Sequence, residues 1–186
     1  THGLRQTLDE AAPHFPVGAP ILSATKGIEV GTLKLVSGIF EDHFPREQHH
    51  LLTYLGGPSF AKEVAAGMPT AVVVAGHDAA VAERVQGALG TERLRVYTTD
   101  DVVGIELGGA LKNVIAIAAG IGDGLGFGHN TRAALVTRGL AEIGRLGSKL
   151  GANPMTLAGL GGIGDLLLTC TGDLSRNRRV GLELGK

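Results

Sequence analysis

Apolar and polar residues repeat with two different periods along the first hundred positions of the chain. Residues 4–14 and 33–44 place apolar side chains three and four apart, which predicts two amphipathic helices, the first ended by Pro16. Four short apolar runs predict β-strands, at 19–27, 49–57, 70–78 and 94–101. The third run begins TAVVVA and is nearly continuous, as in strands that are buried on both faces. Asp78 can cap a helix that ends near Leu89.

This alternation of strands and helices, with short connections bounded by glycine, predicts an α/β sheet in which at least some strands are parallel. After Asp101 an apolar stretch rich in small residues is too long for a strand. Residues 130–150 then form a helical pattern that Gly151 can end. Its apolar face consists of Val136, Leu140, Ile143 and Leu150. Shorter helices are predicted at 166–170 and from Ser175, so the chain changes at 98–101 from an α/β part to an all-helical part.

Three glycines, Gly139, Gly144 and Gly147, lie inside the helical pattern at 130–150. Each costs about 1 kcal/mol relative to alanine in a helix interior. Glycine has no side chain, so we expect these positions to permit close approach between helices.

Composition and charge limit the classes of function. Hydrophobic residues make up 44% and charged residues 19%, which is a globular rather than a disordered composition. With 17 Lys+Arg against 18 Asp+Glu the net charge is −1, which gives no general attraction to nucleic acid or to an anionic membrane. Any anion site must therefore be a local cluster. The sequence predicts no metal site.

The single cysteine, Cys170, allows no internal disulfide and favours a reducing cytoplasm. It lies in the apolar run DLLLTC, where a buried small side chain is more common than a nucleophile. No stretch is expected to reach the roughly 18 apolar residues of a membrane span, and the start of the chain has no signal-peptide pattern. The chain opens at Thr1 within a helical pattern, which suggests a fragment.

Gly159, Gly161 and Gly164 in GLGGIGD fit the G-x-G-x-x-G pattern of a dinucleotide-binding turn. Such a turn needs a β-strand directly before it, a helix at its end and an acidic residue about 20 positions further on. The preceding ANPMTLA contains an Asn-Pro pair, which starts a turn or a helix, and Glu183 lies inside a helical pattern. We therefore interpret GLGGIGD as a tight glycine turn between helices.

Asp165 and Thr169 are four apart on the helix that follows, so they share one face and suggest a polar pocket. The alternative is a capping aspartate and a threonine that bonds to its own helix backbone. The next segment, SRNRR (175–179), gathers three arginines at a helix start that Ser175 can cap. Free backbone N–H groups, the helix dipole and guanidinium groups together suit phosphate. A solvated basic turn is the alternative here.

Two lysines are candidates for acid–base chemistry or anion binding. Lys112 lies in an apolar helical stretch, where Gly108 and Gly109 leave the neighbouring surface bare for a ligand. Partial desolvation lowers the pKa of such a lysine and suits proton transfer, although the side chain can also extend to water. Lys26 follows one strand and Ser59 the next, at the sheet edge where α/β proteins bind ligands.

The chain resembles the bacterial type of NAD(P)-dependent glycerol-3-phosphate dehydrogenase in segments that together cover essentially all of it. They are ATKGIE, GGPSFAKEVAAGMPTAVVVA, GGALKNVIAIAAGIGDGLGFGHNTRAALVTRGLAEIGRLG and GLGGIGDLLLTCTGDLSRNRRVG. The resemblance implies the C-terminal part of a Rossmann-type α/β domain, which binds NAD or NADP, over residues 1–101. It also implies an incomplete all-α substrate domain over 102–186, similar to the C-terminal helical domain of 6-phosphogluconate dehydrogenase.

The resemblance also implies roles for single residues. Lys112 corresponds to the catalytic lysine, which takes the proton from the C2 hydroxyl of sn-glycerol 3-phosphate as hydride leaves for the nicotinamide, and returns a proton to dihydroxyacetone phosphate in the reverse direction. Lys26 and Arg176 correspond to contacts with both substrate and cofactor, and Ala61 to a cofactor contact. The other implied substrate contacts are Gly57, Ser59, Asn113, Asp165, Thr169, Ser175 and Asn177.

Members of that family begin with a glycine-rich fingerprint and continue past the equivalent of Lys186, so we interpret the chain as the centre of such an enzyme, weak or inactive alone. A cytoplasmic role in supplying glycerol 3-phosphate for phospholipid synthesis is implied, and the family tends toward dimers. Two alternatives stay open. One is another β-hydroxyacid dehydrogenase with a carboxylate substrate, which SRNRR disfavours. The other is a non-catalytic fragment that binds phosphate or mediates oligomerisation.

Overall fold

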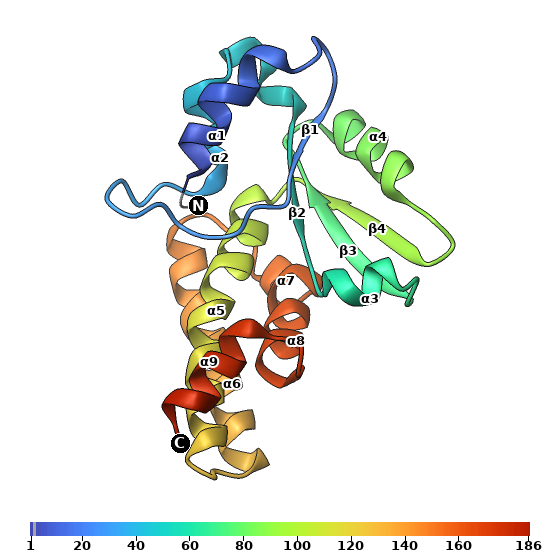
Figure 1. The fold of residues 1–186 in the computed structure, drawn as a ribbon. Helices are drawn as coiled ribbons and strands as arrows, with labels where there is room; N and C mark the ends of the chain where they lie inside the picture. Colours follow the sequence, from blue (N-terminus) through green and yellow to red (C-terminus); the bar gives the residue numbers. More distant parts are fainter. Residues whose placement is uncertain (2) are drawn as a thin grey trace.

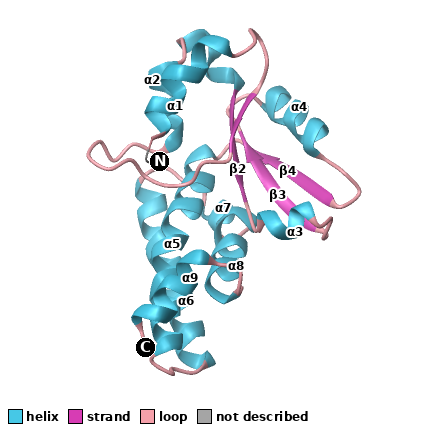
Figure 2. Cartoon of the chain, in the orientation of Figure 1, coloured by secondary structure: helices cyan, strands magenta, loops and turns pink. Residues whose placement is uncertain are grey.

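The structure of the chain, a computed structural model, describes residue 1 and residues 3–186. A four-stranded sheet with helices on both faces is followed by a group of helices around one long central helix (Figure 1). All the strands lie in the first part, and the described residues after 101 form helices and the turns between them (Figure 2). The sequence predicts this fold class, an α/β part followed by an all-helical part, and the prediction is confirmed.

The sheet is mixed. Its strands, in spatial order, are β1 (Ile21–Ser23), β2 (Leu52–Gly56), β3 (Thr70–Ala75) and β4 (Leu94–Thr99). β1 pairs with β2 and β3 with β4 in parallel, and these pairs are connected through the crossover helices α2 (Val36–His43) and α4 (Ala79–Leu89). β2 and β3 are antiparallel, because the chain turns back through the short helix α3 (Ala61–Ala65), which the sequence pattern did not predict. Two of the three pairs are therefore parallel, in line with the expectation.

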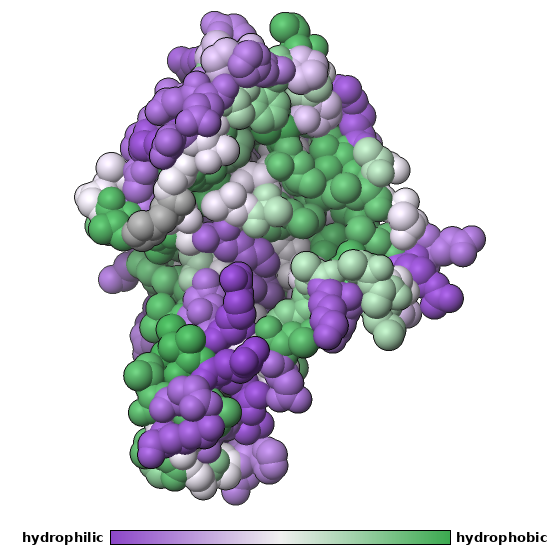
Figure 3. Space-filling model, in the orientation of Figure 1, coloured by the Kyte–Doolittle hydropathy of each residue, from purple (hydrophilic) through white to green (hydrophobic). Residues whose placement is uncertain are grey.

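Helices cover both faces of the sheet. Within β3, Val72 and Val74 pack with Val85 of α4, whereas Val73 joins the cluster of Phe40 from α2. Successive strand residues point to opposite faces, so the valine run is buried on both sides as predicted. The helix α1 (Leu4–Ala11) adds Leu8 to the cluster of Phe40. Figure 3 shows apolar surface gathered over the sheet beside α4 and hydrophilic surface over α1.

Predicted boundaries shift in places. The helix predicted at 33–44 begins at Val36, since Leu33 has a positive φ of 59° that a helix does not allow. The strand predicted from residue 49 begins at Leu52, because a 3-10 helix, η2 (Arg46–Leu51), precedes it. The first predicted helix continues beyond α1 as the 3-10 helix η1 (Ala12–His14). The predicted cap of α4 is confirmed, since Asp78 accepts a hydrogen bond from Val81 N at 3.1 Å.

The helical part is built around α5 (Val102–Gly124), which packs against the other helices. They are α6 (His129–Lys149), α7 (Pro154–Leu157), the π-helix η3 (Leu160–Gly164), α8 (Asp165–Thr171) and α9 (Arg176–Leu184). α5 is long and apolar enough to span a membrane by length and composition, so the expectation that no stretch reaches this length is wrong. In this fold α5 is a central helix, and 56% of its most apolar window is buried inside the molecule.

Two of the three glycines within α6 permit close packing, as predicted. A methyl group at Gly139 would lie 2.8 Å from Ile115, and one at Gly147 would lie 2.8 Å from Leu157. Gly144 faces open space, so the prediction fails there. Leu150 is 51% exposed rather than on the buried face, because it lies beyond the last residue of α6.

α9 lies even closer to α5, through glycines on both helices. A methyl group at Gly181 of α9 would overlap the carbonyl group of Ile117 on α5. One at Gly120 of α5 would overlap the carbonyl oxygen of Arg178 on α9. The backbones therefore touch, and this contact fixes the position of α9 along the central helix.

Candidate active site

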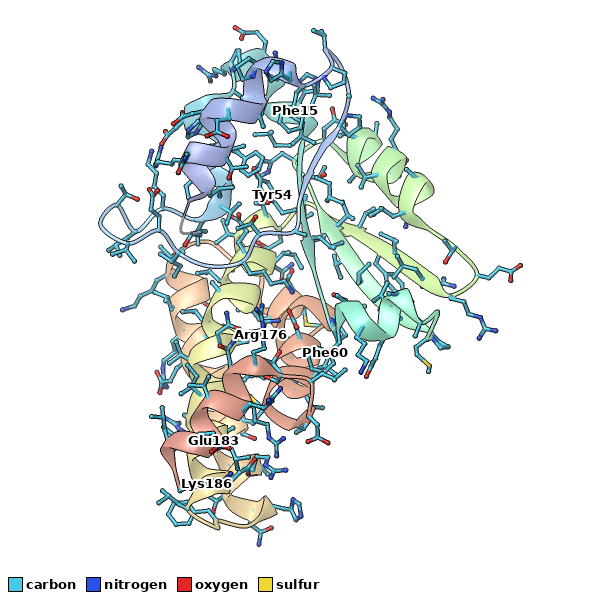
Figure 4. The ribbon with its side chains drawn as sticks, viewed as in Figure 1. Phe15, Tyr54, Phe60, Arg176, Glu183 and Lys186 are labelled. Atoms are coloured by element: carbon cyan, nitrogen blue, oxygen red, sulfur yellow. The ribbon has the colours of Figure 1, made fainter. Side chains whose placement is uncertain are left out.

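A cavity of about 650 Å³ opens where the sheet-bearing part meets the helices. All the residues that the resemblance implies for the site line it, except Gly57 and Asp165. The lining ones are Lys26, Ser59, Ala61, Lys112, Asn113, Thr169, Ser175, Arg176 and Asn177. Ala24, Phe60, Lys62 and Leu174 also contribute, and sequence reasoning did not single them out. Figure 4 shows Phe60 and Arg176 near each other at this junction, and Figure 3 shows hydrophilic side chains gathered there.

The residues converge because six elements begin, end or pass at the cavity. Lys26 follows the end of β1, and Ser59 lies between β2 and α3. Lys112 lies in the middle of α5, Thr169 in α8, and Arg176 at the first position of α9. The carboxyl ends of parallel strands meet at one sheet edge, which explains why the segments after β1 and β2 are neighbours.

Asp165 joins the two lysines. Its side chain is 2% exposed, and Oδ1 lies 2.5 Å from Lys112 Nζ while Oδ2 lies 2.7 Å from Lys26 Nζ. Each ammonium donates to a different oxygen of the same carboxylate, so both positive groups are held side by side. Asp165 is not among the residues that line the cavity, and its carboxylate binds the two lysines.

The ammonium group of Lys112 lies in a mixed environment. Burial and the neighbouring positive charge of Lys26 lower its pKa to about 8, even though Asp165 opposes the shift. The predicted desolvation of this lysine is therefore confirmed, and its side chain does not extend to water, since it is only 11% exposed. A group with this pKa can both accept and donate a proton near neutral pH.

The surface beside Lys112 is not bare, contrary to the prediction. The side-chain carbons of Lys26 occupy the space over Gly109, with Cδ 3.2 Å from the position a Cβ would take. The backbone of Gly161 occupies the space over Gly108. These glycines therefore admit other parts of the chain and not a ligand.

GLGGIGD does not form a dinucleotide turn. It follows α7 and not a strand, and most of it forms the π-helix η3, in line with the interpretation as a glycine turn between helices. A methyl group at Gly161 would overlap Ile105 of α5, and one at Gly162 would overlap the backbone of Leu157. The backbone of this turn thus packs on α5, which places Asp165 beside the two lysines.

The start of α9 forms one wall of the cavity. Ser175 caps the helix as predicted, accepting a hydrogen bond from Arg178 N at 3.2 Å. Asn177 Nδ2 donates to Asn113 Oδ1 at 2.7 Å, which ties this turn to α5. Among the three arginines of SRNRR, only Arg176 lines the cavity.

The other two arginines of SRNRR have different surroundings. Arg178 Nε donates to Asp123 Oδ2 at 2.9 Å, and its Nη1 lies 3.0 Å from Asp173 Oδ1. Arg179 is exposed and does not line the cavity. The expectation of a cluster of three arginines at one anion site is therefore wrong, because an acidic partner on α5 turns Arg178 away.

Three further residues singled out in the sequence, Thr169, Gly57 and Cys170, have internal contacts. Thr169 Oγ1 donates to the carbonyl oxygen of Asp165 at 2.6 Å, which is the backbone contact weighed as the alternative. Gly57 has a φ of 105°, which favours glycine, and its carbonyl oxygen accepts a hydrogen bond from Ser59 Oγ. Cys170 is fully buried and its burial raises its pKa to about 11, so it is an inert core residue as predicted.

The cavity wall is strongly cationic. Its charged side chains are Lys26, Lys62, Lys112 and Arg176, and no carboxylate lines it. With the N-terminus of α9 added, this arrangement favours a small ligand that carries an anionic group. Within the part of the chain that the structure describes, no group of three or more His, Cys, Asp or Glu side chains could hold a metal ion.

Comparison with known proteins gives matches at both ends of the chain. Residues 1–82 match the family described as NAD-dependent glycerol-3-phosphate dehydrogenase N-terminus, and residues 101–186 match its C-terminus. A glycerol-3-phosphate dehydrogenase (NAD(P)+) of Citrifermentans bemidjiense is 61% identical over 98% of this chain and 55% of its own length. One of Myxococcus xanthus is 59% identical over 100% of this chain and 56% of its own length. The chain thus spans about half the length of these relatives.

Two solved structures that resemble this chain are also glycerol-3-phosphate dehydrogenases. The crystal structure of glycerol-3-phosphate dehydrogenase from Coxiella burnetii is similar with a TM-score of 0.90 and 42% identity, over 98% of this chain and 55% of that one. A structure of glycerol-3-phosphate dehydrogenase from Saccharomyces cerevisiae is similar with a TM-score of 0.82 and 29% identity, over 99% of this chain and 54% of that one. The likeness extends over both the sheet-bearing part and the helical part.

Proposed function

The chain belongs to the NAD-dependent glycerol-3-phosphate dehydrogenase family, and on that premise we propose that the whole protein interconverts sn-glycerol 3-phosphate and dihydroxyacetone phosphate with NAD or NADP. The observation that supports this most is the pairing of Lys112, whose pKa is lowered to about 8, with a cationic cavity free of carboxylates. A phosphorylated alcohol needs both a proton acceptor near neutral pH and an anion site.

In the proposed reaction Lys112 accepts the proton of the substrate C2 hydroxyl and returns a proton to the carbonyl oxygen in the reverse direction. Asp165 keeps Nζ of Lys112 fixed, because the carboxylate is buried and both of its oxygens are occupied by lysines. A nicotinamide bound beside Lys112 would supply the hydride acceptor for C2 in the oxidation and the hydride donor in the reduction. Lys26, beside Lys112, adds a second positive charge that stabilises the developing alkoxide.

The substrate phosphate is proposed to bind at the start of α9. Arg176 offers guanidinium N–H groups, and Ser175 and Asn177 flank it in the same turn. Gly57, Ser59, Asn113 and Thr169 are proposed to shape or line the rest of the substrate site. The Asn113–Asn177 hydrogen bond keeps this turn at a fixed position relative to Lys112.

The residues present fit one end of the cofactor only. Lys26, Ala61 and Arg176 line the cavity near Lys112 and are proposed to contact the nicotinamide half. Ala61 has a small side chain at the first position of α3, which leaves space beside the backbone. Among the residues that the structure describes, none forms a strand, glycine-rich turn and helix of the kind that holds a pyrophosphate.

We propose further that the whole protein is a cytoplasmic homodimer that supplies glycerol 3-phosphate for phospholipid synthesis, and that residues 1–186 alone have little activity. The support is the membership of the family together with a nicotinamide site that the described residues form only in part.

The test is oxidation of NADH or NADPH by the full-length protein in the presence of dihydroxyacetone phosphate. We expect Lys112→Ala to lower kcat by about 10²–10⁴-fold, whereas Lys149→Ala, an exposed lysine at the end of α6, keeps the wild-type rate. Unchanged turnover in Lys112→Ala would refute the proposed role. A carboxylate analogue turned over faster than the phosphate would instead favour the other β-hydroxyacid dehydrogenases.

A further inference from the structure

The helix α5 has three contacts with residues at the two ends of the loop that connects β1 with α2. Glu106 binds Ser37 at the start of α2, Gly109 lies against the stem of Lys26, and Lys112 meets the end of Lys26 at Asp165. Glu106 and Gly109, like Gly109 and Lys112, are neighbours three positions apart, but Glu106 and Lys112 lie about 120° apart around the helix axis, so the contacts wind around α5. The segment from Lys26 to Ser37 is therefore held at its two ends on the helix that carries the proposed acid–base group, while residues 30–34 between them are exposed.

We propose that Glu106 is a positioning residue for Lys26: by binding the start of α2 it holds the far end of this segment on α5 and so keeps the ammonium group of Lys26 beside Lys112. The inference rests on the proposed function, because the role of Lys26 at the substrate belongs to that proposal. Glu106 itself does not line the cavity.

The Glu106 carboxylate is buried, and both of its oxygens bind Ser37. It is 7% exposed, Oε1 accepts a hydrogen bond from Ser37 N at 2.7 Å, and Oε2 accepts one from Ser37 Oγ at 2.5 Å. Ser37 is the second residue of α2, whose N-cap position, Leu35, has no capping side chain. Glu106 therefore caps α2 from another element of the chain, and it satisfies an N–H group that a helix start leaves free.

Among the residues that the structure describes, no positive side chain forms an ion pair with this carboxylate. The other ionisable groups that influence it are Tyr54 on β2 and Glu41 on α2, and neither is a cation. Burial without a cationic partner makes the ionised form of Glu106 costly, and the two hydrogen bonds to Ser37 offset part of that cost. The pair is therefore a rigid contact, suited to fixing one segment on another.

Two further contacts hold the same segment on the helix. Leu35 packs against the apolar cluster of the helical part, which includes Leu107 and Leu111 of α5. The stem of Lys26 fills the space over Gly109, with Cγ 3.3 Å and Cδ 3.2 Å from the position of a Cβ. The segment is thus attached to α5 near both of its ends, and loss of the Glu106 contact leaves its α2 end held by Leu35 without the hydrogen bonds of Ser37.

The experiment is a double-mutant cycle on kcat/KM for dihydroxyacetone phosphate, with the full-length protein. Glu106→Ala is expected to lower kcat/KM about 10-fold or more, and Glu106→Gln, which can still bond to Ser37, to stay within about 3-fold of wild type. If Glu106 acts through Lys26, the double variant with Lys26→Ala loses no more than Lys26→Ala alone. Losses that multiply would overturn the proposal. Glu142→Ala, an exposed residue of α6, is the control and should leave kcat/KM unchanged.

A second readout does not depend on catalysis. The full-length protein is acetylated briefly, and modification of each lysine is measured by mass spectrometry. In Glu106→Ala we expect Lys26 to react several-fold faster than in wild type, with exposed Lys149 as the internal reference. An unchanged rate at Lys26 in a folded variant overturns the positioning role.

If Lys26→Ala keeps full kcat/KM while Lys26 still reacts faster in Glu106→Ala, the proposed function of Lys26 is wrong and the positioning stands. Should Glu106→Ala not fold, Ser37→Ala serves in both assays, with a smaller effect in the same direction.

Discussion

Lys112 and Asp165 are 53 positions apart in the sequence, yet Nζ of the lysine lies 2.5 Å from Oδ1 of the aspartate. The contact joins the middle of α5 to the first turn of α8, and the aspartate is almost fully buried. Burial and the charge of Lys26 favour the neutral amine, whereas Asp165 favours the ammonium form. The balance leaves the pKa of Lys112 at about 8, within the range where an enzyme can use either form.

The pH dependence follows from this balance. Oxidation of glycerol 3-phosphate needs neutral Lys112, so kcat/KM should rise as pH increases through about 8. Reduction of dihydroxyacetone phosphate needs the ammonium form, so kcat/KM should fall over the same range. Asp165→Asn removes the charge that raises this pKa, and the inflection should move to lower pH. Profiles measured in both directions at constant ionic strength check this, and an inflection that stays in place in Asp165→Asn contradicts the assignment.

The three arginines of SRNRR should differ in their effect on substrate binding. Arg176→Ala is expected to raise KM for dihydroxyacetone phosphate about 10- to 100-fold, since a charge-assisted hydrogen bond contributes about 1.5–3 kcal/mol. Arg179→Ala should leave KM within about 2-fold, because this arginine is exposed and does not line the cavity. Steady-state kinetics of the two full-length variants provide the comparison. Equal effects on KM would show that substrate binding depends on the overall positive charge of this turn and not on the position of the Arg176 guanidinium.

Local sequence patterns predicted the helices and strands better than they predicted which strands pair and in which direction. The run TAVVVA is buried on both faces as its pattern indicates, and Asp78 and Ser175 cap the helices expected of them. Such features depend on neighbouring residues, which is why they can be read from the sequence. The antiparallel pairing of β2 with β3 depends on how the chain turns between them, and nothing in the pattern of GGPSF specifies that direction.

The arrangement of the site depends on contacts between distant segments. Sequence reasoning singled out Lys26 and Lys112 separately, but could not show that both bind one carboxylate. It counted Arg178 with the anion site, because the partner that turns it away, Asp123, is 55 positions distant. Glu106 was missed, although a carboxylate within the apolar run VGIELGG was a usable signal, since a charge in such a run needs buried partners.

The contact between α5 and α9 should be sensitive to a single methyl group. Gly181→Ala would overlap the backbone at Ile117, which no side-chain motion relieves, so we expect a loss of about 1–3 kcal/mol in the free energy of unfolding. Gly144→Ala is the matched control, because that position within α6 is open and alanine favours the helix by up to about 1 kcal/mol. Denaturant unfolding of the full-length variants measures both. Similar values for the two would mean that the helices separate easily.

The buried carboxyl group of Glu106 should make stability depend on pH. Burial raises its pKa from 4.5 to about 7, so the folded state binds this proton more tightly than the unfolded chain does. The contribution is fully present below pH 4.5 and is lost as pH rises through about 7. The shift corresponds to a contribution on the order of 3 kcal/mol.

Glu106→Gln carries no titratable group at this position and keeps a partner for Ser37. The free energy of unfolding of the full-length wild type, relative to this variant, should therefore fall between pH 5 and pH 8, where other groups titrate equally in both proteins. Denaturant unfolding at each pH gives the difference. Glu142→Gln, at an exposed position on α6, should show a constant difference from wild type over the same range. A constant difference for Glu106→Gln would mean that the carboxylate is ionised in the folded state as readily as in the unfolded chain, which its burial and the absence of a cationic partner oppose.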